Sequence, residues 1–326
     1  MKPYLRLPLA ALLALLVAFA LAACGSDDEE PAAEKPAAEK AASTIIESDP
    51  ANASKGTITV GSKNFTEQYI LGQIYAQTLE ALGFEVKKRL NLGSEQIAFK
   101  ALKSGQIDAY PEYTGTSLTS FFDLKTDEVP KDPNEAYELT KENYAKEGIT
   151  ALPITSFEDT FRVATTKEKQ AGLLKGATKL SELDPAAPLR ITGFPECRQR
   201  TDCLLGLQDT YGFDNLKFVS TEQKYEPLNN DQTDLGFVFS TDGELSLDKY
   251  AIIEDDKGLF PPYNISFGIK DEKLEEIGPE GQEVLERVQA PLTEEVMQEL
   301  NSRVDLDKQE PAKVAADYLK ESGFVQ

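Results

Sequence analysis

The residues best suited to chemistry lie in two short motifs. Residues 61–68 read Gly-Ser-Lys-Asn-Phe-Thr-Glu-Gln, and residues 110–116 read Tyr-Pro-Glu-Tyr-Thr-Gly-Thr. The pattern between them predicts a β-α-β-α-β unit whose loops bring Lys63, Tyr113 and Thr116 to one edge of a sheet. A cation, a ring face and a hydroxyl together suit a small ligand with a carboxylate at one end and an apolar cation at the other.

The composition excludes several classes of catalyst. The chain has 326 residues and no histidine, which removes Ser-His-Asp and Cys-His nucleophile systems, histidine bases and histidine-containing zinc sites. Asp and Glu number 56 against 34 Lys and Arg, so the formal net charge is -22. A chain this acidic repels phosphate backbones, and we expect no nucleic-acid partner.

Residues 1–24 have the anatomy of a lipoprotein signal peptide. Two basic residues are followed by an unbroken apolar run over residues 7–20, and Leu-Ala-Ala-Cys at residues 21–24 matches the bacterial lipobox. Cys24 would then be lipidated and become the first residue of the mature protein. A transmembrane anchor is the alternative, but the apolar run is short for a bilayer span.

The remaining cysteines are Cys197 and Cys203. An exported protein lies outside the reducing cytosol, so we expect a disulfide between them. The bond would close a small loop and restrain its conformation, rather than hold a domain together. Two free thiols are the alternative.

Helix and strand patterns alternate through the body of the chain. Residues 25–55 contain an acidic run, a repeated Pro-Ala-Ala-Glu-Lys pentad and few large apolar residues, which predicts a flexible acidic tether. The folded body begins near Gly56, and Asn64 and Glu67 have the spacing of a capping box that begins a helix. A second α/β set occupies residues 189–256, and the alternation indicates largely parallel sheets.

Two segments, near residues 157–163 and 261–268, cross between the α/β sets. Two crossings predict a hinged pair of domains, with the chain returning to the first. We place lobe 1 at residues 56–158 and 267–326, and lobe 2 at residues 159–266.

Four motifs resemble those of one protein family. Residues 62–68 and 110–116, together with Ser-Thr-Asp-Gly at 240–243 and Pro-Pro-Tyr at 261–263, resemble the substrate-binding proteins of ABC importers for glycine betaine, choline and related osmoprotectants. The resemblance extends over residues 56–326. It implies an α/β protein with the type II periplasmic-binding fold, in which two lobes enclose the ligand.

The resemblance also implies the site residues. The family holds the ligand's carboxylate with basic residues, here Lys63 and Arg200, because Arg-Thr-Asp at 200–202 resembles the family's Arg-Pro-Asp segment. Arg198 is the competing choice for this role. The family surrounds the quaternary ammonium group with aromatic rings, and the remaining implied ligand-binding residues are Tyr113, Phe161, Phe239 and Tyr263 as rings, Thr116 through its hydroxyl and Asp159 through its backbone carbonyl.

The resemblance further implies an extracytoplasmic, lipid-anchored protein with no catalytic residue, cofactor or metal. It would act as a monomer, capture glycine betaine or a related quaternary amine, and deliver it to an ABC permease and ATPase complex. Choline, carnitine and proline betaine are alternative ligands, because aromatic boxes discriminate these poorly.

Two other classes of function are compatible with a two-lobed scaffold. A ligand-sensing lipoprotein would bind the same solute without a transport partner. An enzyme would require paired acidic residues in the cleft, whereas the motifs supply Lys63, Arg200 and rings.

The chain departs from the family at Phe161 and Phe239, where tyrosine is usual. Phenylalanine retains the ring face and loses the hydroxyl, so cation–π attraction is kept and any hydrogen bond from that hydroxyl is lost. Weaker affinity or a different ligand would follow. As plain apolar residues, these phenylalanines are also typical of a core.

Overall fold

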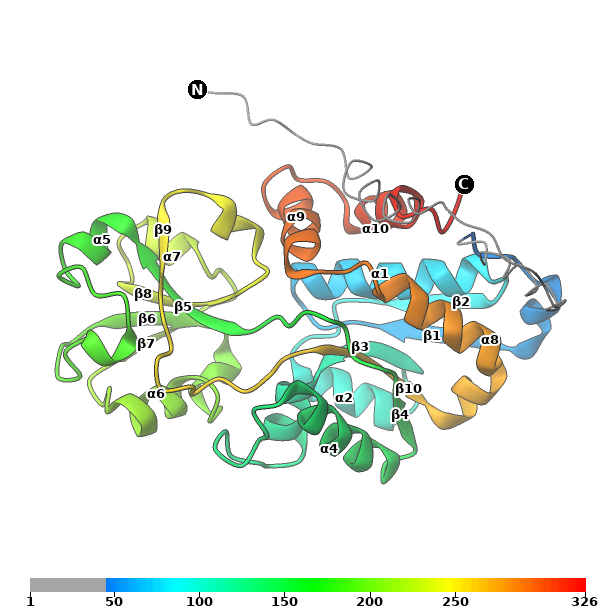
Figure 1. The fold of residues 1–326 in the computed structure, drawn as a ribbon, viewed down its shortest axis with the longest axis horizontal. Coiled ribbons are helices and arrows are strands. Elements are labelled where there is room, and N and C mark those ends of the chain that lie inside the picture. Colours follow the sequence, from blue (N-terminus) through cyan, green and yellow to red (C-terminus); the bar gives the residue numbers. More distant parts are fainter. Residues whose placement is uncertain (1–44) are drawn as a thin grey trace, which may run out of the picture.

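The computed structural model describes residues 45–326, which form two lobes lying side by side (Figure 1). Each lobe contains one five-stranded mixed sheet with helices packed around it. The two-lobed α/β architecture expected from the sequence is confirmed. The predicted signal peptide, Cys24 and most of the predicted tether lie outside the described residues. The rest of that segment, residues 45–55, is folded onto the first lobe rather than extended as a tether: it includes the short helix η3 (Pro50–Lys55), and the Ile46 N–H donates to the Phe324 carbonyl at 2.8 Å.

The sheet of the first lobe has the strand order β2-β1-β3-β10-β4. The first three are parallel, as the alternating pattern predicts, whereas β10 runs antiparallel to β3 and β4. Since β10 comes from late in the chain, the polypeptide returns to the first lobe after building the second. The strands are β1 (Thr57–Gly61), β2 (Glu85–Arg89), β3 (Ala109–Tyr113), β4 (Ile149–Ala151) and β10 (Ile265–Lys270).

The sheet of the second lobe repeats this topology with the order β7-β6-β8-β5-β9. Strand β6 is parallel to β7 and β8, and β5 is antiparallel to β8 and β9. The strands are β5 (Phe161–Thr166), β6 (Arg190–Gly193), β7 (Lys217–Ser220), β8 (Leu235–Phe239) and β9 (Tyr250–Ile253).

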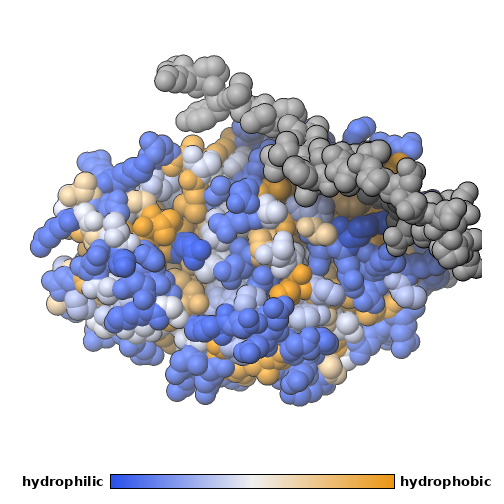
Figure 2. All heavy atoms as spheres, viewed as in Figure 1, coloured by the Kyte–Doolittle hydropathy of each residue, from blue (hydrophilic) through white to orange (hydrophobic). Residues whose placement is uncertain are grey.

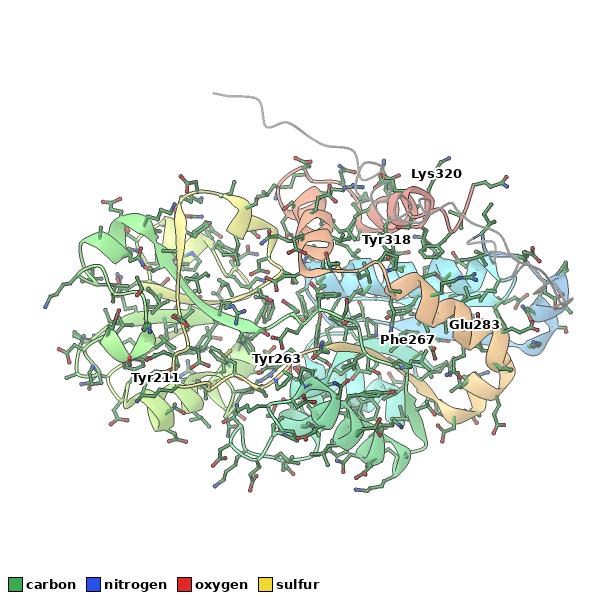
Figure 3. All side chains as sticks on the ribbon, in the orientation of Figure 1. Tyr211, Tyr263, Phe267, Glu283, Tyr318 and Lys320 are labelled. Atoms are coloured by element: carbon green, nitrogen blue, oxygen red, sulfur yellow. A yellow bond between two sulfur atoms is a disulfide. The ribbon has the colours of Figure 1, made fainter. Side chains whose placement is uncertain are left out.

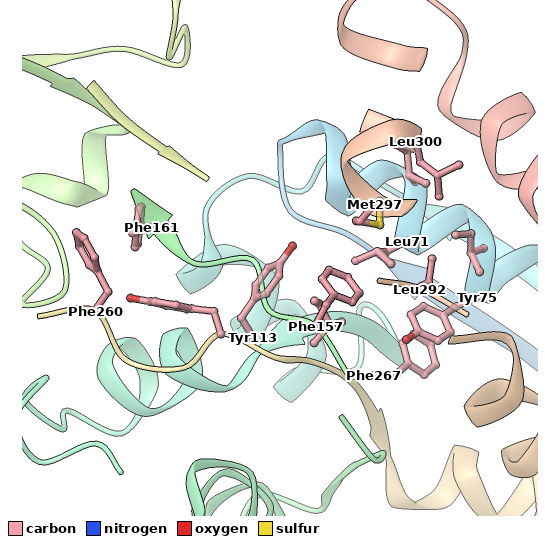
Figure 4. Packing of buried hydrophobic residues seen from close by; sticks show 14 of the residues in the cluster. Leu71, Tyr75, Tyr113, Phe157, Phe161, Phe260, Phe267, Leu292, Met297 and Leu300 are labelled. Carbon is pink, nitrogen blue, oxygen red and sulfur yellow. The ribbon is translucent and has the colours of Figure 1, made fainter. Parts of the chain in front are cut away.

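The longer helices belong to the first lobe. Its core forms where α1 packs between the sheet and the C-terminal helices, and the ring of Tyr75 stacks on Phe267 at 4.1 Å between centroids (Figure 4). The helices of this lobe are η3 (Pro50–Lys55), α1 (Thr66–Ala81), α2 (Glu95–Lys103), α3 (Thr114–Thr116), η4 (Ser117–Phe121), α4 (Pro133–Ala145), α8 (Asp271–Gln289), α9 (Glu294–Asp305) and α10 (Pro311–Glu321). Those of the second lobe are α5 (Lys167–Ala171), η5 (Leu180–Glu182), η6 (Pro195–Arg198), α6 (Leu204–Tyr211), α7 (Glu226–Asn229) and η7 (Gly243–Ser246).

Two extended segments connect the lobes, one between β4 and β5 and the other between β9 and β10. They are hydrogen-bonded to each other: the Asp159 backbone N–H donates to the Tyr263 carbonyl at 3.1 Å, and that of Thr155 donates to the Ile265 carbonyl at 2.9 Å. The crossings therefore form one paired hinge rather than two independent linkers.

The surface is predominantly polar. Figure 2 shows hydrophilic residues over most of the visible face, with apolar residues in scattered groups. Within residues 45–326, none of the helices has the length and apolar character needed to span a bilayer.

The lobes also meet away from the hinge, where α9 of the first lobe contacts η7 of the second. The Ser302 hydroxyl donates to the Gly243 carbonyl at 3.3 Å. A Cβ atom on Gly243 would lie 2.6 Å from the Ser302 Cα and 2.7 Å from its backbone nitrogen, closer than side-chain carbons approach a backbone. Glycine is therefore required at this position for the lobes to close.

We predict that Gly243→Ala shifts the lobes toward a more open arrangement. The added methyl group meets fixed backbone atoms, and overpacking of this kind costs about 1–3 kcal/mol. The radius of gyration from small-angle scattering should increase. Gly172→Ala is the matched control, because the nearest atom to its Cβ is 3.3 Å away and belongs to the same lobe. Identical scattering from both variants would contradict the prediction.

Candidate functional site

A cavity lies between the lobes, and its atom-free space together with its opening to solvent is about 520 Å³. Its walls include all of the residues that the sequence predicts as ligand-binding: Lys63, Tyr113, Thr116, Asp159, Phe161, Arg200, Phe239 and Tyr263. The structure thus brings together side chains from both lobes and from both hinge segments.

Phenyl and phenol rings form the apolar wall. Phe161 lies 5.1 Å from Phe239 and 5.6 Å from Tyr263 between ring centroids, the latter in an edge-to-face arrangement. Phe65 lies 5.2 Å from Phe239 and 6.1 Å from Tyr113, so it joins rings of the two lobes. Figure 4 shows Phe161 near Phe260, with 5.9 Å between their ring centroids, and Tyr113 farther toward the first lobe.

Several lining residues were not anticipated from the sequence. Asn64 and Phe65 lie inside the motif at residues 61–68, so this motif is the sequence signal that could have identified them as lining residues. Cys197 was predicted only as a disulfide partner, and the remaining three had no distinguishing pattern. The complete additional set is Asn64, Phe65, Glu95, Phe194, Glu196 and Cys197.

Lys63 is buried and already has an anionic partner. Its ammonium group forms an ion pair with Glu112, and its Nζ lies 4.4 Å from the centroid of the Tyr113 ring. Glu112 also accepts hydrogen bonds from the Tyr110 hydroxyl and the Tyr113 backbone N–H, each at 2.8 Å. Lys63 therefore supplies an ammonium group to the cavity wall, and the carboxylate of Glu112 balances the charge of this ammonium group.

Arg200 is held by Asp202 in a two-point contact. Its Nε and Nη2 donate to the carboxylate at 2.7 and 2.6 Å, and Nη2 also lies 3.4 Å from the Thr116 hydroxyl. Burial by itself raises the pKa of Asp202, but the charge and hydrogen bonds of Arg200 hold it below its usual value. The Arg200 guanidinium carbon is 5.2 Å from the Phe161 ring centroid.

The competing arginine lies elsewhere. Arg198 is exposed, and its guanidinium carbon is 5.0 Å from the Phe218 ring centroid. It is absent from the cavity wall, whereas Arg200 is part of it.

A disulfide between Cys197 and Cys203 closes the loop that carries Arg200. Cys197 is itself a lining residue. The bond therefore restrains the segment that presents the guanidinium group and its Asp202 partner.

The predicted capping box is wrong. Helix α1 begins at Thr66 with Phe65 as its N-cap and without a side-chain cap. The Asn64 amide instead donates to the Glu222 carboxylate at 3.1 Å, across the cleft from the second lobe. The side chains of Asn64 and Glu67, which the local pattern assigned to capping, instead form hydrogen bonds with residues distant in the sequence.

Glu67, the other capping candidate, belongs to a buried acidic junction behind the aromatic wall. It accepts hydrogen bonds from the Tyr113 hydroxyl at 2.9 Å and the Asn301 amide at 3.2 Å, and it also contacts the Thr241 hydroxyl. That hydroxyl lies 2.7 Å from Asp159 Oδ1. A hydroxyl has one hydrogen and can donate to only one carboxylate, so the other carboxyl group carries a proton.

The surroundings of the junction favour this proton. Burial raises the pKa of both Glu67 and Asp159, and the negative charge of Asp242 raises each further. Lys224 forms an ion pair with Asp242 and only partly offsets these effects at Asp159.

Glu244 of η7 and Asp305 at the end of α9 are two further acids where the lobes meet, and Asp242 acts on both of them electrostatically. Burial, followed by the charges of Asp305 and Asp242, raises the pKa of Glu244 to about 7. Burial also raises the pKa of Asp305. Closure of the lobes thus brings several carboxyl groups together.

A family model for the substrate-binding domain of the ABC-type glycine betaine transport system matches residues 56–321. The chain belongs to this family. The resemblance expected from the sequence is therefore confirmed, and the chain is related to substrate-binding proteins of transporters.

Individual family members agree with this assignment. The glycine-betaine-binding protein of Pseudomonas aeruginosa is 33% identical over 82% of this chain and 89% of its own length. The carnitine transport binding protein OpuCC of Listeria monocytogenes is 27% identical over 84% of this chain and 89% of its own length. A solved glycine betaine/carnitine/choline ABC transporter structure, 26% identical, superposes with a TM-score of 0.65 over 81% of this chain and 98% of its own, which confirms the periplasmic-binding fold.

We predict that replacing both Cys197 and Cys203 with serine lowers the free energy of unfolding of this family member by about 2 kcal/mol, the loop-closure value for so short a loop. Chemical denaturation of the oxidised wild type and the double variant would measure the difference. The wild type under reducing conditions is the control, because these are the cysteines of the described residues. Equal stability of all three samples would contradict the prediction.

Proposed function

We propose that this chain captures glycine betaine or a related quaternary-ammonium solute between its lobes and delivers it to an ABC permease and ATPase complex. The observation that carries the proposal is a cavity whose wall combines cations from both lobes with several aromatic rings. The names of the P. aeruginosa and L. monocytogenes relatives support the same ligand class.

The rings suit the ligand's head group. A trimethylammonium group has no N–H to donate, so hydrogen-bond acceptors gain little from it. A ring face offers negative quadrupole and apolar contact together, worth about 0.5–2 kcal/mol for each ring. Phe161 and Phe239 supply such faces without hydroxyls, and Tyr113 is held in place by Glu67.

The cations lie close to the rings: Lys63 Nζ is 4.4 Å from the Tyr113 ring centroid, and the Arg200 guanidinium carbon is 5.2 Å from that of Phe161. Lys63, Arg200 and the Thr116 hydroxyl would meet the ligand's carboxylate or other polar end. Because Asp202 occupies the Nε and Nη2 side of Arg200, the ligand would use the Nη1 side of the guanidinium group.

Further parts of the proposal concern the setting of the protein. We place it outside the cytoplasm as a monomer, anchored through lipid on Cys24, with lobe 1 at residues 56–158 and 267–326 and lobe 2 at residues 159–266. A sensing lipoprotein without a transport role is the second candidate. A permease and ATPase gene pair beside this gene would favour transport.

The general test is a thermal-shift screen of the body without its anchor. A ligand that binds the native state raises the melting temperature by mass action. Quaternary amines should raise it, and amino acids without a quaternary nitrogen should not. Stabilisation by other solutes alone would contradict the proposal.

We predict that Arg200→Ala and Tyr113→Ala each weaken glycine betaine binding about tenfold or more, through loss of a charge-assisted contact or a desolvated ring face. Calorimetric titration would measure both. Arg198→Ala is the matched control, since this neighbouring arginine lies outside the cavity. Wild-type affinity in both cavity variants would remove the assignment of these residues.

When the lobes close around the ligand, buried carboxyl groups should bind protons from solution. The pKa values of Glu67, Asp159 and Glu244 are raised in the closed arrangement. In the open protein they return toward the ordinary carboxyl values of about 4. The protonated forms therefore stabilise closure fully below that pH, and this stabilisation is lost as pH rises through the raised values, which for Glu244 is about 7.

We accordingly predict that glycine betaine affinity falls as pH rises from about 5 to about 8, and that binding takes up protons in this window. Titration in buffers of different ionisation enthalpy measures the uptake. Glu67→Gln should reduce both effects, whereas Glu283→Gln, an exposed change on α8, should retain them. A pH-independent affinity in the wild type would refute the coupling.

A further inference from the structure

Glu95 is a buried acid in the wall of the cavity. It is the first residue of α2, its exposed fraction is 4 %, and its Oε1 lies 3.8 Å from Arg200 Nη1. Among the described residues, Arg200 is its cationic partner, and the separation is too long for a hydrogen bond. Glu95 therefore places a negative charge beside the guanidinium group without using up its donors.

The position of Glu95 matters because of how Arg200 is used. Arg200 donates hydrogen bonds from Nε and Nη2 to the Asp202 carboxylate. Its Nη2 also donates to the Thr116 hydroxyl. Within residues 45–326, Nη1 donates no hydrogen bond, and it is the guanidinium nitrogen that lies 3.8 Å from Glu95 Oε1. A ligand carboxylate bound to Nη1 would have to sit beside the carboxylate of Glu95.

The cavity wall carries surplus negative charge. Lys63 is balanced by Glu112 and Arg200 by Asp202, which leaves Glu95 and Glu196 as additional acids in the wall. Burial, and then the charge of Glu95, raises the pKa of Glu196. Another anion is therefore disfavoured here, since like charges repel strongly in a site that closure has dried.

An uncharged alcohol fits the same position better. A hydroxyl group both donates and accepts, so it can donate to the Glu95 carboxylate and accept from Arg200 Nη1. Choline and glycine betaine have the same trimethylammonium head and differ at the other end, which is a primary alcohol in one and a carboxylate in the other. The aromatic rings contact the trimethylammonium group that both ligands share. Selectivity between choline and glycine betaine therefore depends on the residues that contact the alcohol or the carboxylate.

We propose that Glu95 is a specificity-determining residue that disfavours a carboxylate beside Arg200, so that a quaternary-ammonium alcohol binds more tightly than its carboxylate counterpart. This inference rests on the proposed function of the cavity. The selectivity would come from electrostatic repulsion between Glu95 and the ligand carboxylate. This repulsion weakens binding of the carboxylate ligand and does not require better contacts with the alcohol.

The test is calorimetric titration of choline and glycine betaine into the wild type and Glu95→Gln. The wild type should bind choline more tightly. The variant removes the charge and keeps the shape, so the ratio of the glycine betaine Kd to the choline Kd should fall about tenfold or more. Glu95→Asn removes the same charge with a shorter side chain and should act in the same direction if Glu95→Gln is poorly folded.

Glu283→Gln is the matched control, because it makes the same charge change on α8, far from the cavity residue Tyr263 (Figure 3). Its Kd ratio should equal that of the wild type. A ratio that stays within twofold of the wild type in both Glu95 variants, or a wild type that prefers glycine betaine, overturns the role of Glu95 and leaves the proposed function standing. Failure of the wild type to bind either ligand overturns the proposed function and this inference with it.

Discussion

Asp202 is completely buried between the lobes, and the closed arrangement depends on its carboxylate. It receives Arg200 from its own loop, the Thr119 hydroxyl from the first lobe at 3.0 Å and the Tyr263 hydroxyl from the hinge at 2.7 Å. A buried carboxylate is tolerated only when such partners satisfy it. One anion thus connects a loop of the second lobe, a helix of the first and the segment between them, and it fixes the face that Arg200 presents to the cavity.

The same constraint operates throughout the site. A cavity that encloses a charged solute must be dry, yet its walls contain ionisable groups, so each wall cation is matched by a carboxylate behind it. Lys63 has Glu112 and Arg200 has Asp202, and outside the cavity wall Lys224 is paired in the same way with Asp242. Where acids exceed cations, at Glu67 and Asp159, the structure satisfies hydrogen bonding by retaining a proton. Charge balance, proton uptake and ligand choice are therefore linked consequences of closing the lobes.

Much of the architecture was predictable because local patterns and topology agree. The alternation of strand and helix patterns identified both α/β lobes and the two crossings between them. The capping box failed for a physical reason. Asn64 and Glu67 have the correct spacing, but the long-range partners Glu222 and Tyr113 compete for the same side chains. Local propensity yields to tertiary contacts where a site is built.

The amino-acid types and their order determined which chemistry this chain can offer: no histidine, an acidic surface, and rings and cations carried at strand ends. These properties are readable without coordinates, because composition excludes reactions and period-two and helical patterns reflect burial. The pairing of charges was decided by the tertiary structure alone. Glu95 lies far from Arg200 along the chain and has no sequence pattern to mark it, and only the approach of the lobes brings their charges within 3.8 Å. Electrostatic interaction depends on separation in space, and separation in sequence does not specify it.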